Sequence, residues 1–308
     1  MTMDLKQMQY FLCLAQEGNV TRAARQLNIV QPALSMQIAK LEKSLGKQLF
    51  YRSSHGMSLT RAGEVLVLRL APIIADIDRA RDEMAQLDGK VSGRVSIGMI
   101  TSAAQSTLPV STAKIAARYP GIHLLVCEAY SETMMEWVAA GQLDIAIVNV
   151  PARRPALTAK HILDEELMLA QGAEDKSRLP NVRSFDRLRD LDIVIPSRRH
   201  GLRRILDDAA ADAGFSLSPR LEIDTLSAIC EVVASTNLVT VLPGIALHPT
   251  LSAGRTRARR LRDPSIVRSV AWVTNPRRAV SAAMSAVMDI ISEDLTKAAA
   301  SASQLVSR

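Results

Sequence analysis

The sequence predicts a chain of two parts: an N-terminal helix-turn-helix followed by a long helix, and a C-terminal α/β domain. Residues 18–46 combine a helix of small residues, a short turn and a second helix with one polar face, which is the pattern of a helix-turn-helix. Residues 66–87 carry apolar side chains at alternating steps of four and three, as in helices that pair with another helix. From residue 94 onward, short apolar runs alternate with helical patterns, which favours a parallel sheet covered by helices.

The helix-turn-helix follows a supporting helix whose apolar residues, from Leu5 to Ala15, repeat at helical spacing. Thr21 is expected to cap the first helix of the motif with its hydroxyl, and Pro32 suits the first turn of the second helix. The expected buried stripe of this second helix consists of Leu34, Ile38, Leu41 and Leu45. Its opposite face carries side chains that can hydrogen-bond to DNA, namely Gln31, Ser35, Gln37 and Lys40.

A short hairpin with Gly56 at its tip, the wing, is expected over residues 51–59. Arg52 would face a DNA phosphate or the minor groove, and Ser53 would contact the DNA backbone; the alternative for Arg52 is an ordinary surface charge. Thr60 then opens the long helix. The seam that we expect to hold two chains together contains Leu66, Leu70, Ile73, Ile77 and Met84, and the alternative is that this stripe packs on its own chain. Pro72 lies inside the seam, although an internal proline costs an ideal helix roughly 3 kcal/mol.

Ligands of α/β sheets bind beyond the carboxyl ends of the strands, where helix N-termini favour anions. The hydroxyl, amide and guanidinium side chains expected at this edge are Thr101, Ser102, Ser131, Asn149, Ser197, Arg198 and Thr225. Each hydroxyl taken alone is as well explained as a helix cap. Their convergence on one crevice, with arginines nearby, favours a pocket for a small organic anion.

The run AARQLNIVQPALSMQIAKLEKSLGKQLFYR followed by LTRAG resembles the winged helix-turn-helix of LysR-type transcriptional regulators. Val30 departs from the family's usual capping Ser or Thr, and Met36 stands where a polar or basic residue is common. The resemblance extends through GRVSIG, Leu108-Pro109, Tyr119-Pro120-Gly121, the run from Gly141 to Ala146, and Val241-Leu242-Pro243, and is nearest to nitrogen-assimilation-type regulators. The residues that it assigns to DNA binding are Thr21, Arg22, Gln31, Pro32, Ser35, Gln37, Lys40, Arg52 and Ser53.

The resemblance implies a DNA-binding domain over residues 1–63, a linker and dimerisation helix over 64–92, and an effector-binding domain over 93–308 that resembles periplasmic binding proteins. Lobe one of that domain would comprise residues 93–165 and 270–308, and lobe two residues 166–269. It also implies a homodimer that assembles into a homotetramer, a two-fold related promoter site in double-stranded DNA, a small-molecule effector and contact with RNA polymerase. No cofactor is expected.

Composition fits this interpretation. The net charge is +7, and residues 1–63 hold eight Lys and Arg against three Asp and Glu, so most of the excess lies beside the expected DNA reader. Three widely spaced cysteines predict no disulfide framework or metal site. We expect a cytoplasmic protein, because no signal peptide and no membrane span is recognisable.

An enzyme or cytosolic ligand-binding protein built on the α/β domain is the alternative, although the five histidines are scattered and no phosphate loop or nucleophile motif is present. A transport-type solute-binding protein is opposed by the N-terminal helix-turn-helix.

Overall fold

The computed structural model describes residues 3–53, 56–86, 91–150, 157–174 and 184–306. The chain divides into an N-terminal unit, Met1–Asp88, and a C-terminal unit that comprises Gly89–Ala139 and Leu143–Arg308.

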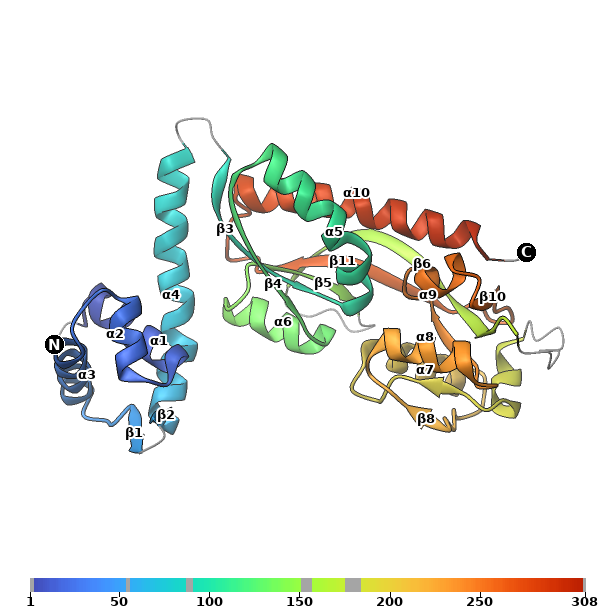
Figure 1. The fold of residues 1–308 in the computed structure, drawn as a ribbon, viewed down its shortest axis with the longest axis horizontal. Coiled ribbons are helices and arrows are strands. Elements are labelled where there is room, and N and C mark those ends of the chain that lie inside the picture. The colour runs from blue at the N-terminus through green and yellow to red at the C-terminus, as the bar shows by residue number, and fades with distance from the viewer. Residues whose placement is uncertain (1–2, 54–55, 87–90, 151–156, 175–183, 307–308) are drawn as a thin grey trace. The chain divides into compact units, whose positions relative to one another are not determined.

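The N-terminal unit is a three-helix core with a hairpin and a long helix (Figure 1). Its elements are α1 (Leu5–Glu17), α2 (Val20–Gln26), α3 (Gln31–Leu45), β1 (Phe50–Ser53), β2 (Gly56–Leu59) and α4 (Arg61–Gln86). Strands β1 and β2 pair as the expected wing, and the backbone N–H of Met57 ties it to Gly18 at the end of α1. Buried side chains from α1, α2, α3 and the start of α4 form the core, among them Phe11, Ala23, Leu34, Ile38 and Leu41.

The first helix of the motif is capped differently from the prediction. Asn19, not Thr21, is the N-cap, and its Oδ1 accepts hydrogen bonds from the backbone N–H groups of Thr21 (2.9 Å) and Arg22 (3.0 Å). Asn19 has the extended backbone that a cap needs, whereas Thr21 already lies inside the helix. Helix α3 begins after Val30 without a side-chain cap, as that residue implied, and Leu45 at its end is exposed rather than buried.

Thr60 opens α4 as predicted, with its hydroxyl oxygen accepting from the N–H of Gly63. The prediction for the seam was wrong in its first half. Leu70 is 2% exposed and lies in the core of its own unit, with Leu66 packed against it, because α1 covers this part of α4. Ile77 is half-buried, while Ile73 and Met84 are 45% and 68% exposed. Pro72 lies inside the helix, as the sequence implied.

Lobe one of the C-terminal unit is built on a sheet whose parallel strands are β3 (Ser92–Met99), β4 (Gly121–Glu128) and β5 (Ile145–Asn149). Helices α5 (Thr101–Arg118) and α6 (Ser131–Ala140) connect these strands, and α10 (Ala282–Gln304) packs against α5 and β3. Strand β11 (Val267–Thr274) joins the sheet antiparallel to β5, so the sheet is mixed rather than wholly parallel. The predicted strand-helix alternation therefore places the carboxyl ends of β3, β4 and β5 at one edge.

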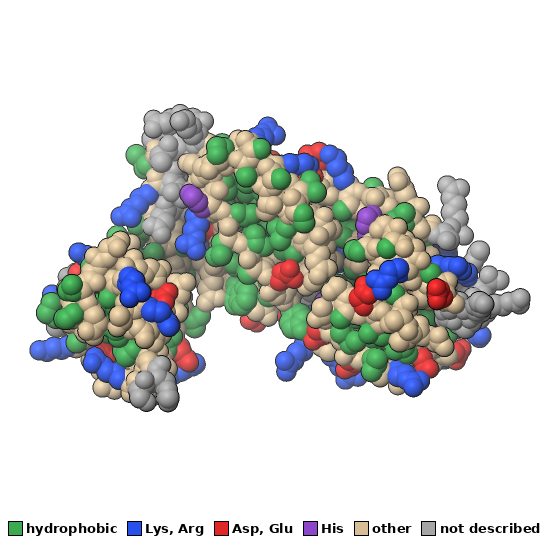
Figure 2. Space-filling view, in the orientation of Figure 1, with side chains coloured by type: hydrophobic (Ala, Val, Ile, Leu, Met, Phe, Trp, Pro, Cys, Tyr) green, Lys and Arg blue, Asp and Glu red, His purple; other side chains and the backbone are tan. Residues whose placement is uncertain are grey.

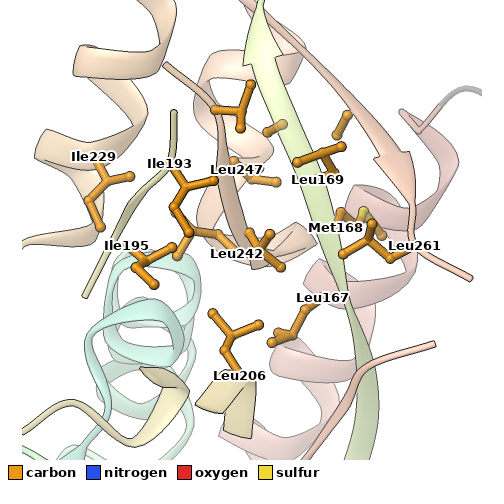
Figure 3. Packing of buried hydrophobic residues seen from close by; sticks show 14 of the residues in the cluster. Leu167, Met168, Leu169, Ile193, Ile195, Leu206, Ile229, Leu242, Leu247 and Leu261 are labelled. Atoms are coloured by element: carbon orange, nitrogen blue, oxygen red, sulfur yellow. The ribbon is translucent and has the colours of Figure 1, made fainter. Parts of the chain in front are cut away.

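Lobe two contains short strands and helices around a compact apolar core (Figure 3). Its elements are η1 (Phe185–Asp190), β7 (Val194–Ile195), α7 (Gly201–Asp212), β8 (Leu221–Glu222), α8 (Leu226–Ser235), β9 (Thr240–Pro243), α9 (Gly244–Ser252) and β10 (Thr256–Arg260). Leu167, Leu206, Ile229 and Leu242 come together in this core from four elements (Figure 3). Helix α9 and strand β10 were not predicted from the sequence.

Two long strands connect the lobes. Strand β6 (Thr158–Gly172) pairs with β11 over its first part and with β9 and β10 over its last part, and β11 returns the chain to lobe one. The sheet order is β10-β6-β11-β5-β3-β4, with β9 also paired to β6. The chain thus crosses between the lobes twice, as the family resemblance implied. Helix α10 continues to Gln304, and Val306 beyond it is buried in the lobe-two core.

Candidate nucleic-acid interface and ligand pocket

The outer face of α3 is polar and cationic apart from the exposed side chains of Met36 and Ala39. Leu34, Ile38 and Leu41 are buried, and the residues on the other side of the helix, including Gln31, Lys40 and Lys43, are exposed. The side-chain N–H of Gln31 donates to the hydroxyl of Ser35, one turn later, at 3.3 Å. Figure 2 shows Lys and Arg side chains spread over the visible face of the N-terminal unit. The arrangement presents hydrogen-bonding groups and positive charge on one helix face, as a major-groove reader does.

Several residues predicted to contact DNA have partners within the unit. The Arg22 guanidinium donates to the Glu17 carboxylate at 3.1 Å, and Gln37 accepts from the side-chain N–H of Gln7 at 3.4 Å. The Ser53 hydroxyl donates to the carbonyl of Gly56 and so closes the wing. Thr21, Pro32 and Arg52 are exposed. Gln31 and Lys40 are exposed as well, and DNA contact by these residues stays a prediction.

A pocket of about 510 Å³ lies between the lobes of the C-terminal unit, at the carboxyl ends of the lobe-one strands. Thr101, Ser131, Asn149 and Thr225, four of the predicted ligand residues, line it. Glu128, Tyr130, His200, Gly201 and Asp224 are among its other lining residues. The sequence therefore singled out three hydroxyl residues and one amide of this lining, but not the tyrosine, the histidine or the carboxylates.

Four helices begin at this pocket. Thr101, Ser131 and Gly201 are the first residues of α5, α6 and α7, and Thr225 is the N-cap of α8. The N-caps of α5 and α8 make no side-chain cap hydrogen bond. N-terminal N–H groups that lack a cap, together with the positive end of the helix dipole, attract an anion.

Ser102 lies under the pocket, not in its lining, and is 2% exposed. Its hydroxyl accepts a hydrogen bond from the guanidinium of Arg268 at 2.9 Å, and Arg268 also donates to Asn149 at 3.4 Å. Two further guanidinium N–H groups donate to the Glu165 carboxylate at 2.9 and 2.6 Å. The prediction that Ser102 holds a ligand with a free hydroxyl is corrected: this hydroxyl belongs to a buried charge network at the lobe crossing.

Ser197 and Arg198 do not reach the interlobe pocket. They line a separate open depression with Arg220 and Glu222, so Arg198 is not placed to close on a ligand beside Thr101. The backbone N–H of Ser197 instead donates to Asp224 at 2.9 Å. Asp224 also accepts a 2.7 Å hydrogen bond from the Tyr130 hydroxyl, which joins lobe two to lobe one at the rim of the pocket. Burial raises the pKa of Asp224, but the hydrogen bonds from Tyr130 and Ser197 outweigh this effect and hold the pKa below its ordinary value.

His200 is the least expected residue of the pocket. It is 8% exposed, and burial, opposed by Asp224 and reinforced by Arg268, lowers its pKa from 6.5 to about 4. The ring is therefore neutral at pH 7. Its Nδ1 accepts from the backbone N–H of Leu202 at 3.2 Å, so the proton is on Nε2, which can donate to a ligand. Its position directly before a helix and after a buried strand was the sequence signal that could have identified it.

A second chamber of about 470 Å³ adjoins the first. Both chambers are lined by Ser131, Asn149 and Gly201, and a Cβ built on Gly201 would lie 3.4 Å from Asn149 Nδ2 and 3.5 Å from Ser131 Oγ. The second chamber is lined by α6 and α7, whose Glu132 and Arg204 form an ion pair at 2.5 Å. These are ordinary van der Waals distances, so Gly201 marks the place where the two chambers adjoin without a contact that requires glycine.

Among the described residues, no group of three or more His, Cys, Asp or Glu side chains is arranged to hold a metal ion. Within the same part of the chain, no helix is both long and apolar enough to cross a membrane.

Residues 5–64 match the family model of the bacterial regulatory helix-turn-helix protein, lysR family, and residues 88–296 match the LysR substrate binding domain. The HTH-type transcriptional regulator BbuR of Bordetella bronchiseptica is 29% identical, with 88% of this chain and 84% of that protein covered. The nitrogen assimilation regulatory protein nac of Escherichia coli is 26% identical, with 94% of each covered.

Solved structures show the same fold. A full-length OxyR variant from Pseudomonas aeruginosa superposes with a TM-score of 0.73 at 22% identity, covering 96% of this chain and 98% of that one. Full-length CbnR, solved in a complex with its target DNA, has a TM-score of 0.67 at 18% identity, covering 96% and 100% of the two chains.

Proposed function

Because the chain belongs to the LysR family of DNA-binding transcriptional regulators, we propose that its interlobe pocket senses a small carboxylic acid and thereby controls DNA binding by the N-terminal unit. The observation that carries this proposal is the start of four helices at one pocket, two of them without a side-chain cap. A carboxylate in this position would accept hydrogen bonds from N–H groups of α5 and α8, with the Thr101 and Thr225 hydroxyls beside it.

The acidic rim refines the class of effector. Asp224, whose pKa is held low, and Glu128 both line the pocket, and neither has an arginine or lysine among the pocket's lining residues. A ligand with a single negative charge and no donor would be repelled by these carboxylates. We therefore propose an effector with a carboxylate at one end and a hydroxyl or amino donor at the other. The neutral His200 ring would supply a further N–H from lobe two.

The test begins with the full-length protein and a panel of small organic acids, hydroxy acids and α-amino acids. A binder is identified by a raised unfolding temperature, since a ligand that binds only the folded state stabilises it. Calorimetry then compares the wild type with Thr101→Val combined with Thr225→Val. Hydrogen bonds to a charged group contribute roughly 1.5–3 kcal/mol each, so we expect affinity to fall at least tenfold.

Thr112→Val is the matched control, because Thr112 is exposed on the same helix as Thr101 and its hydroxyl bonds to the Leu108 carbonyl. It should leave affinity unchanged. Unaltered binding by the double variant would show that the two hydroxyls are only structural. Failure of every acid in the panel, with sequence-specific DNA binding intact, would reject the carboxylate while leaving the regulator in place.

Assembly and location complete the proposal. A homodimer would form through exposed apolar residues of α4, among them Val65, Leu68, Ile73 and Met84. Such a dimer would present two α3 helices to a two-fold related promoter site, and two dimers would form a tetramer. The protein would bind DNA in the cytoplasm and would also contact RNA polymerase there.

A further inference from the structure

Met36 occupies the centre of the DNA-facing side of α3. It follows Leu34 by two residues, so it lies about 200° further round the helix axis than that core residue. Leu34 is fully buried, whereas Met36 is 63% exposed. One turn before Met36 lies Pro32 and one turn after it lies Lys40, and both are exposed.

A single exposed methionine on a protein surface is unremarkable by itself. This one differs in its setting, because it lies between hydrogen-bonding and cationic side chains on the same face. Gln31 and Ser35 bond to each other on one flank, and Gln37 is held by Gln7 on the other. Lys40 and Lys43 continue the face toward the end of the helix and supply the charge that phosphates need. The partner that fits the whole face is therefore DNA, with the thioether at its middle.

A thioether cannot donate a hydrogen bond to a base edge and accepts only weakly. The group in the major groove that an apolar side chain contacts favourably is the C5-methyl of thymine. Val30, at the N-cap of α3 and 69% exposed, adds a second apolar group at the end of the helix that enters the groove first. An apolar reading position thus replaces a polar one in this helix.

We propose that Met36 is a specificity-determining residue that reads a thymine methyl group at one position of each half-site. The inference rests on DNA binding through α3. Burying one methyl group contributes about 0.8 kcal/mol, which corresponds to about fourfold in affinity. The readout is therefore a modest preference at a defined base pair, which arises from an apolar contact with the methyl group rather than from hydrogen bonds.

The experiment first selects binding sites for the full-length protein from a random-sequence duplex pool. Each thymine of one selected half-site is then replaced in turn by deoxyuridine, which removes the methyl group and keeps every hydrogen-bonding atom. We expect one replacement to weaken wild-type binding about fourfold. Met36→Ala should bind the thymine and deoxyuridine sites equally, because it has lost the contacting side chain.

Leu45→Ala is the matched control. Leu45 is an exposed apolar residue on the same helix. It lies about 20° from the buried Leu34 around the helix axis, so it faces away from the groove. It should keep the fourfold preference for the methyl group. As a second arm, Met36→Gln should reselect sites with adenine at that position, since glutamine pairs with adenine through two hydrogen bonds.

The proposal is overturned if no thymine replacement affects wild-type binding, if Met36→Ala retains the preference, or if Met36→Gln selects the same sites as the wild type. Failure to select any sequence at all would instead refute sequence-specific binding by this chain. The two failures are therefore distinguishable in one selection.

Discussion

At the scale of single residues, the C-terminal unit depends on charges that water cannot reach. Arg268 is 1% exposed and donates to Glu165, Ser102 and Asn149, while Glu165 also accepts from the backbone N–H of Ile245 at 2.8 Å. The residues of this network lie on the two crossing strands β6 and β11, on α5 and β5 of lobe one, and on α9. A buried charge retains its place only when its partners satisfy it, so the network is sensitive to loss of one member.

Arg268→Ala should destabilise the C-terminal unit by about 3–5 kcal/mol, because it leaves the Glu165 carboxylate buried without its counter-charge. Combining Arg268→Met with Glu165→Gln should recover much of the loss, since both charges are then absent. Urea unfolding of the three proteins measures the difference. A single variant as stable as the wild type would show that the pair contributes nothing.

His200 makes the stability of the folded chain depend on pH within a defined range. Its pKa is about 4 in the folded chain and 6.5 ordinarily. Between pH 4 and pH 6.5 the ring is therefore protonated in the unfolded chain but neutral in the folded chain. Stability from this residue is present above pH 6.5 and is lost as the pH falls to 4, by about 3 kcal/mol in total. His200→Asn, whose side chain can still cap α7, should lose less stability than the wild type between pH 7 and pH 5 in urea unfolding. His123→Asn, at an exposed position, should behave as the wild type does, and an equal pH slope in all three would locate the linkage elsewhere.

At the scale of elements, α4 changes its role along its length. Its first part closes the core of the N-terminal unit through Leu70, and Gly63 lets it approach Leu49 so closely that a Cβ there would lie 2.2 Å from the Leu49 carbonyl oxygen. Its outward side carries exposed apolar residues. One apolar repeat thus serves two surfaces, and substitutions on the two sides should have separable effects.

Leu70→Ala should cost the N-terminal unit about 2–5 kcal/mol, as for other buried leucines, with little direct effect on association. Ile73→Asp should leave the fold intact and separate the dimer proposed above, because it introduces a charge into an apolar contact. Circular dichroism and sedimentation velocity distinguish these effects. A Leu70→Ala protein of normal stability, or an Ile73→Asp protein of normal mass, would contradict the respective assignment.

The sequence predicted those features that depend only on residues close together in the chain. The stripe of Leu34, Ile38 and Leu41 and the hydroxyls at the ends of β3 and β4 follow from spacing along a short stretch of chain. Leu70 was misassigned because the surface that covers it comes from α1, far away in the sequence. Helix α9 was missed because Pro249 lies inside it, and the Glu165–Arg268 pair was missed because 103 residues separate its members.

At the scale of the whole molecule, charge is concentrated where DNA is expected. The chain carries a net charge of +7, and α3 and the wing expose Lys40, Lys43 and Arg52. Each phosphate contact releases counterions, so binding should weaken steeply as salt rises. The C-terminal unit also carries exposed arginines. The salt dependence of DNA affinity distinguishes these arginines from the cations of α3 and the wing.

Lys40→Gln should reduce the slope of log affinity against log salt by about 0.9 for each DNA-binding unit, with base preference unchanged. Arg257→Gln, which changes an exposed arginine of β10 in the C-terminal unit, should leave the slope as it is. Fluorescence anisotropy at several salt concentrations provides the measurement. A smaller slope for Arg257→Gln than for Lys40→Gln would place the DNA contact in the C-terminal unit.

Strand β6 has a mechanical consequence. Its Thr158–Glu166 part pairs with β11 and its Leu167–Gly172 part pairs with β9 and β10, so one unbroken backbone belongs to both lobes. Moving one lobe as a rigid body about a loose joint would break that ladder, whereas bending the strand would not. The register shift between Val270 and Ala271 marks where such bending is easiest. The effector-binding domain should therefore bend along β6. Ligand occupancy would then set the curvature of this strand instead of switching the domain between an open and a closed form.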